Sequence, residues 1–88
     1  MKIKTGFVLE KVGDSHLACA TGKLATEFSG FVRLNDTGAM LWEALSTDTD
    51  EKTLVELIVS TYGIDENTAA KDCAAFLATL RNNGILDE

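Results

Sequence analysis

The chain has 88 residues, of which 45% are hydrophobic and 25% are charged, and its formal net charge is −6. Fourteen acidic residues against eight basic ones disfavour nucleic-acid binding, which depends on Lys and Arg side chains that neutralise phosphates. No apolar run approaches the roughly 18–20 residues of a membrane span, and the run after the N-terminal lysines is too short for a secretion signal. We therefore expect a cytoplasmic protein with one domain, residues 1–88.

The first third of the chain predicts β-strands. Residues 7–12 (FVLEKV) and 15–21 (SHLACAT) flank Gly13 and Asp14, a pair that is typical of a two-residue hairpin turn. The second run alternates with a period of two, as a half-buried strand does. A third strand is expected over about 30–34, because aromatic and β-branched side chains suit a pleated surface.

The rest of the chain predicts three helices, over about 36–45, 51–62 and 66–83. Each has apolar side chains at three- and four-residue spacing on one face. These are Gly38, Leu41, Trp42 and Leu45, then Leu54, Leu57, Ile58 and Tyr62, then Ala69, Cys73, Phe76, Leu77 and Leu80. We therefore predict an α+β fold, in which a three-stranded antiparallel β-sheet is followed by three helices and is winged helix-turn-helix-like.

The ends of the helices carry residues with the required hydrogen-bonding or backbone properties. The side chain of Asn35 or Asp36 can accept from the free N–H groups that begin the first helix, and Asp65 can do so for the third. Gly63 can end the second helix in a left-handed conformation, and Gly84 stops the third. We expect Ile85 and the residue after it to fold back onto the end of the third helix.

No arrangement of residues indicates catalysis. His16 is the only histidine and has no evident partner, so we interpret it as a packed or solvated side chain. Cys19 and Cys73 form no C-x-x-C pair, and a zinc site would lack its usual ligands. A disulfide between them is disfavoured in a reducing cytosol. We predict a binding module that is not an enzyme and needs no cofactor or metal.

Two motifs resemble the PqqD-like family. RLNDTGAMLWEAL, residues 33–45, resembles the strand-to-helix junction of that family, and AAKDCAAFLATLRNNGIL, residues 69–86, resembles its C-terminal part. The matching positions are Leu34, Asn35, Thr37, Gly38, Leu41, Trp42 and Leu45 in the first motif, and Asp72, Phe76, Leu77, Leu80, Gly84 and Leu86 in the second. With the linking segment LVELIVSTYGID, the resemblance covers nearly the whole chain.

The resemblance implies a peptide chaperone, a recognition element for ribosomally made and post-translationally modified peptides (RiPPs). In such proteins the leader of a precursor peptide lies as an extra strand against the third strand, in the groove with the third helix. The peptide is then delivered to a maturation enzyme, often a radical S-adenosylmethionine (SAM) protein. Carried over, the peptide-binding residues are Phe31, Val32, Arg33, Leu34, Asp72, Ala75, Phe76, Thr79 and Asn83.

Strand addition fits the physics of an unpaired edge, whose free N–H and C=O groups a peptide strand can satisfy. Arg33 either pairs with an acid of the leader or extends into water, and the sequence does not favour one over the other. The small side chains of Ala75, Ala78 and Thr79 would leave room for apolar side chains of the leader. The resemblance implies leader recognition without selecting a precursor, a product or a maturation enzyme.

Two other interpretations stay open at this point. A winged-helix DNA-binding regulator would use the third helix for base and phosphate contacts, but that helix offers only Lys71 and Arg81 as cations. A self-associating structural subunit is the other, since the free strand edge could pair with its copy in a homodimer.

Overall fold

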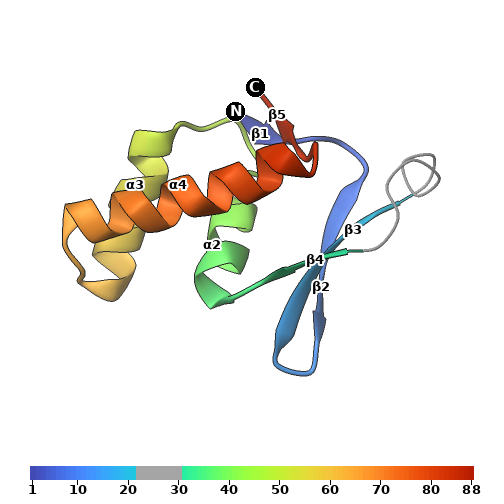
Figure 1. Cartoon of the computed structure of the whole chain (residues 1–88), viewed down its shortest axis with the longest axis horizontal. Helices are drawn as coiled ribbons and strands as arrows, with labels where there is room; N and C mark the ends of the chain where they lie inside the picture. Colours follow the sequence, from blue (N-terminus) through green and yellow to red (C-terminus); the bar gives the residue numbers. More distant parts are fainter. Residues whose placement is uncertain (22–30) are drawn as a thin grey trace.

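The computed structural model describes residues 1–21 and 31–88 (Figure 1). Three antiparallel strands form the main sheet in the order β2-β3-β4, with β2 at Phe7–Val12, β3 at Ser15–Ala20 and β4 at Phe31–Leu34. The helices α2 (Asp36–Ala44), α3 (Glu51–Tyr62) and α4 (Glu66–Asn82) follow. The predicted fold class is confirmed. The expected link at 22–29 and the first residue of the third predicted strand lie outside the described residues.

The first two strands form the predicted hairpin. Val12 pairs with Ser15 across the two-residue turn, and the register continues without interruption to the pair of Phe7 and Ala20. Gly13 has a φ of 61°, in the left-handed region that glycine enters without the steric cost of a side chain. The hairpin projects away from the helices at the bottom of Figure 1.

A second, two-stranded sheet joins the two ends of the chain, and the sequence did not predict it. β1 (Lys2–Ile3) pairs antiparallel with β5 (Leu86–Asp87), so the N- and C-termini lie side by side (Figure 1). Strands of two residues are too short to show a periodic pattern. The expectation that the chain folds back after α4 is confirmed, because Ile85 is fully buried and its N–H donates to the Leu80 carbonyl oxygen at 2.9 Å.

The core lies between the three helices and one face of the main sheet. The predicted apolar face of α2 is buried, including Trp42, and so are most of the residues predicted for α3 and α4. Leu57 and Phe76 are half-buried, and Tyr62 has 46% of its surface exposed, because it sits in the last turn of α3 where the chain turns away at Gly63. Val55, which the periodic pattern did not select, is buried on that helix instead.

Each helix is capped by a side chain that precedes it. Asn35 caps α2, where its Oδ1 accepts from the Gly38 N–H at 2.7 Å. Asp50 and Asp65 accept from the third residue of α3 and α4 at 2.8 Å and 2.7 Å. These hydrogen bonds hold the pKa of both aspartate carboxyls below the usual value of 3.8. The capping aspartates therefore favour folding only while they are ionised.

We expect acid to weaken the fold through these caps. A carboxyl with a lowered pKa in the folded state stabilises it fully above its unfolded pKa, and that contribution is lost as the pH falls through the folded pKa. The urea midpoint of unfolding should therefore fall between about pH 5 and pH 2. Asn caps a helix without titrating, so the double variant Asp50→Asn, Asp65→Asn should lose less stability over this range. The same acid dependence in both proteins would contradict the prediction.

Cys73 lies inside the core as predicted, with none of its surface exposed. Burial, with a smaller contribution from the negative charge of Glu51, raises the pKa of its thiol to about 11. Cys19 is half-buried on β3, and both cysteines are free thiols. Since the thiolate is the reactive form, Cys73 should be inert in the folded protein.

Thiol labelling at neutral pH should therefore modify Cys19 alone until the protein unfolds. A Cys19→Ser variant should show no fast labelling in buffer and full labelling in denaturant, as followed by mass spectrometry. Rapid modification of Cys73 in the folded variant would show that the core opens readily at α4.

Candidate functional site

β4 is an edge strand. It pairs with β3 along one side, from His16 opposite Leu34 to Cys19 opposite Phe31. No strand within residues 1–21 and 31–88 pairs with its other side. An edge of this kind presents unpaired backbone N–H and C=O groups to any extended segment that reaches it.

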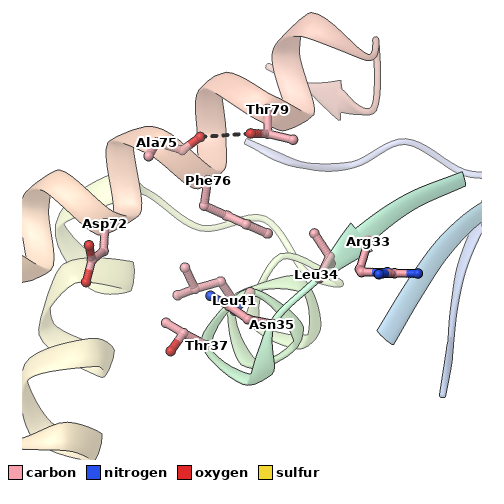
Figure 2. Close-up of a pocket in the computed structure, with 10 residues that line it drawn as sticks. Arg33, Leu34, Asn35, Thr37, Leu41, Asp72, Ala75, Phe76 and Thr79 are labelled. Atoms are coloured by element: carbon pink, nitrogen blue, oxygen red, sulfur yellow. Dashed lines mark hydrogen bonds between the residues drawn. The ribbon is translucent and has the colours of Figure 1, made fainter. Parts of the chain in front are cut away.

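A hollow of about 330 Å³ lies beside this edge, between the start of α2 and the middle of α4 (Figure 2). The residues that line it come from three parts of the fold: Arg33 and Leu34 of β4, Asn35, Thr37, Gly38 and Leu41 of the junction and α2, and Asp72, Ala75, Phe76 and Thr79 of α4. Figure 2 shows Phe76 reaching down from α4 toward Leu34 and Leu41, so the three apolar side chains meet at the centre.

Gly38 allows α4 to approach the strand-to-helix junction closely. A Cβ atom at this position would lie 3.2 Å from the Leu34 Cβ and 3.3 Å from the Phe76 Cε1. Both distances are tighter than ordinary van der Waals contact, so a side chain here would force one of the two neighbours to move. The glycine of the NDTG segment therefore lets Phe76 pack over the junction.

The α4 wall follows from helical spacing. Asp72, Ala75, Phe76 and Thr79 have the spacing i, i+3, i+4, i+7, which places them on one side of the helix. The Thr79 Oγ1 donates to the Ala75 carbonyl oxygen at 3.1 Å, so this hydroxyl is engaged within its own helix (Figure 2). Ala75 and Thr79 are small and exposed, which leaves open space between α4 and the edge of β4.

One cation and one acid mark opposite ends of the hollow. Arg33 lies at the end nearest the sheet, and Asp72 lies at the far end beside α3 (Figure 2). Both side chains are exposed, and none of the ion pairs found in the described part of the chain involves either. Both charges are available to a bound segment.

Six of the nine residues predicted for the site line the hollow: Arg33, Leu34, Asp72, Ala75, Phe76 and Thr79. Phe31 and Val32 lie on the same strand outside it. Asn83 ends α4, and its Nδ2 donates to the Thr79 carbonyl oxygen at 2.8 Å, so it lies one turn beyond the hollow.

The sequence prediction omitted four of the lining residues: Asn35, Thr37, Gly38 and Leu41. They belong to the NDTG segment and the helix turn that follows it, directly after the predicted edge strand. That position in the sequence was the available signal, because a helix that begins at the end of an edge strand must border the same groove.

His16 has a partner that the sequence did not reveal. Its Nε2 lies 2.9 Å from the Asp36 Oδ1, at the first residue of α2. The two residues are 20 positions apart, and the β3–β4 register brings them together by placing His16 opposite Leu34. This contact links the middle strand of the sheet to the start of α2.

Within residues 1–21 and 31–88, no helix is long and apolar enough to cross a membrane. Within the same ranges, no group of three or more His, Cys, Asp and Glu side chains is arranged to hold a metal ion.

Two solved structures resemble this chain over almost its full length. One is "TbiB1 in Complex with the TbiA(beta) Leader Peptide", with a TM-score of 0.78, 25% sequence identity, and coverage of 99% of this chain and 95% of that one. The other is "Lasso peptide synthetase B1 complexed with the leader peptide", with a TM-score of 0.73, 19% identity, and coverage of 96% and 93%. At 19% identity, the second likeness concerns the fold alone.

No curated protein matches the chain. The family model described as coenzyme PQQ synthesis protein D (PqqD) matches residues 18–86. That range contains β4, the junction and the whole of α4, and thus every residue that lines the hollow. The chain belongs to the PqqD family.

Proposed function

We propose that this chain binds the leader segment of a ribosomally synthesised precursor peptide and presents it to a modifying enzyme. The observation that carries the proposal is the open edge of β4 beside a hollow that contains Leu34, Leu41 and Phe76 and that α4 closes on its other side. TbiB1, which has the same fold and is 25% identical, was solved with a leader peptide. That likeness and the family membership support a peptide as the ligand.

The leader adds a strand to β4. Its backbone pairs with the free N–H and C=O groups of the edge, which supplies affinity that depends little on sequence. Selectivity comes from an apolar leader side chain that enters the hollow and packs against Leu34, Leu41 and Phe76. Full burial of one such side chain contributes about 1.5–3 kcal/mol, enough to separate a matching leader from an unrelated peptide.

The proposed binding surface consists of the nine residues expected from the sequence together with the four from the junction and α2. Gly38 and Leu41 shape the floor, while Ala75 and Thr79 leave space for the leader beneath α4. Asn83 contributes only to leaders that extend one helical turn further along α4.

The chain performs no reaction in this proposal. It holds the precursor near a modifying enzyme in the cytoplasm, which raises the local concentration of the substrate by tethering. The resemblance to the PqqD-like family supports a radical SAM enzyme as that partner. Residues 1–88 act as one peptide-recognition domain.

An NMR titration tests the leader site. Isotope-labelled protein is titrated with synthetic leader segments of the short precursor peptides encoded beside its gene. We expect shifts concentrated at the amides of residues 31–34 and along the Asp72–Thr79 side of α4. Shifts confined to other surfaces would contradict the proposed site. If none of these peptides binds, self-association and DNA binding are the alternatives, and light scattering and a salt-dependent gel shift test them.

Filling the hollow should abolish most of the binding. Ala75→Phe places a large ring where the leader side chain enters, and we expect an affinity at least about tenfold weaker because the apolar contact is lost. Ala74→Phe adds the same ring at an exposed neighbouring position that does not line the hollow, so its affinity should match the unmodified protein. Isothermal titration calorimetry compares the three proteins, and equal affinity for Ala75→Phe would contradict the proposed site.

A further inference from the structure

The hairpin register determines which backbone groups of β4 face the open edge. In an antiparallel ladder, hydrogen-bonded and non-bonded pairs alternate, so successive residues of a central strand point their N–H and C=O groups to opposite neighbours. Val12 and Ser15 close the two-residue turn as a bonded pair. In β3, the backbone N–H and C=O groups of Ser15 and of every second residue after it therefore point toward β2. Those of His16 and Ala18 point toward β4.

The same alternation continues into β4. Leu34 and Val32 lie opposite His16 and Ala18, so their backbone groups are used by β3. Phe31 and Arg33 then direct their N–H and C=O groups to the open edge. A strand added there hydrogen-bonds to these two residues, although Phe31 does not itself line the hollow.

The side chains of β4 alternate between the two faces of the sheet. Leu34 is part of the core and Val32 packs against it, on the face that Ala18 shares. Phe31 and Arg33 lie on the opposite face, which points away from the core, and Phe31 is 56% exposed. Arg33 borders the hollow at the edge of the strand, but its side chain extends away from Phe76 and Leu41 (Figure 2). The sheet therefore offers an added strand two different environments, one on each face.

The outer face carries an apolar strip that runs to the open edge. Cross-strand partners form one row of Val8, Cys19 and Phe31, and a second row ends in Leu17 and Arg33. We call these five residues the outer strip. None of them belongs to the core, and Val8 is 39% exposed.

Arg33 is the charged end of the outer strip. Glu10, the acid in its row, lies two strands away, at about 9–10 Å in the hydrogen-bonding direction. No ion pair in the described part of the chain involves Arg33. A residue of an added strand directly beside Arg33 would have its Cβ about 4.5–5.5 Å away, where opposite charges attract and like charges repel.

We propose that both faces of the sheet recognise the leader. The leader places an acidic residue beside Arg33, and the leader residues immediately before and after this acid are apolar. The two apolar residues lie beside Val32 and Leu34 and point toward the hollow, while the acid points to the outer face. Beside Phe31, an aromatic or β-branched residue extends the outer strip. The order of apolar, acidic and apolar residues is expected for a leader that runs parallel or antiparallel to β4, because side chains alternate between the two faces in both cases. This inference rests on the proposed function and names the class of peptide that the site takes.

Selection from a library of displayed random peptides tests the pattern, with three immobilised proteins as baits. Peptides enriched on the unmodified protein should share an acid between two apolar residues. On Arg33→Glu, Lys or Arg should replace that acid while the apolar residues stay. Lys11→Glu makes the same change of charge on an exposed residue of β2, the strand furthest from the open edge, and should retain the acidic consensus.

A double-mutant cycle measures the contact directly. In a synthetic copy of the most enriched peptide, replacing the acid with its amide should weaken binding to the unmodified protein by about two- to fivefold and leave binding to Arg33→Gln unchanged.

The outcomes separate this inference from the function on which it rests. Peptides that lose affinity for Ala75→Phe but keep an acid on Arg33→Glu would overturn recognition on two faces and leave leader binding intact. An enriched consensus without an acid between apolar residues would do the same. Peptides that bind Ala75→Phe as well as the unmodified protein, or a library with no enrichment, would overturn both.

Discussion

The hydrogen bond from the Gly38 N–H to the Asn35 side chain is the contact on which the site depends. It lets the chain pass from β4 into α2 through a single capping residue, so no loop separates the edge strand from the helix. Leu41 and Trp42 then fix α2 in the core. The open edge is thereby held at one position relative to α4, which a groove between a strand and a helix requires.

Gly38 has a second role in this arrangement, which depends on its lack of a side chain. Because Gly38 has no Cβ atom, Phe76 can pack over the junction and form the far side of the hollow. The two roles require different properties, a backbone N–H for the cap and an empty Cβ position for the packing, and glycine supplies both. This accounts physically for a glycine inside the first turn of a helix, where its conformational entropy would otherwise be a cost.

An unpaired strand edge is a hazard as well as a binding surface. β4 has only four residues and carries Arg33, both of which limit pairing between copies of the chain. The proposed ligand pairs with the same edge but also places side chains in the hollow, which a second copy of β4 would have to match. The α3–α4 unit has the form of a helix-turn-helix, and here its second helix forms the wall of a groove with small side chains.

The sequence by itself determined the elements whose causes are local. Capping by Asn35 and Asp65, the left-handed Gly63 and the apolar stripes each depend on residues within one or two turns, so spacing along the chain reveals them. The resemblance in its motifs also selected the strand and the helix between which the hollow was found.

The tertiary structure alone decided the contacts between distant residues, which no local pattern records. These are the pairing of the chain ends in β1 and β5, the approach of His16 to Asp36, the fit of Phe76 over Gly38, and the assignment of Phe31 and Arg33 to the outer face. Each depends on strand register or helix packing, and these are set by the whole fold because they join segments that the chain itself keeps apart.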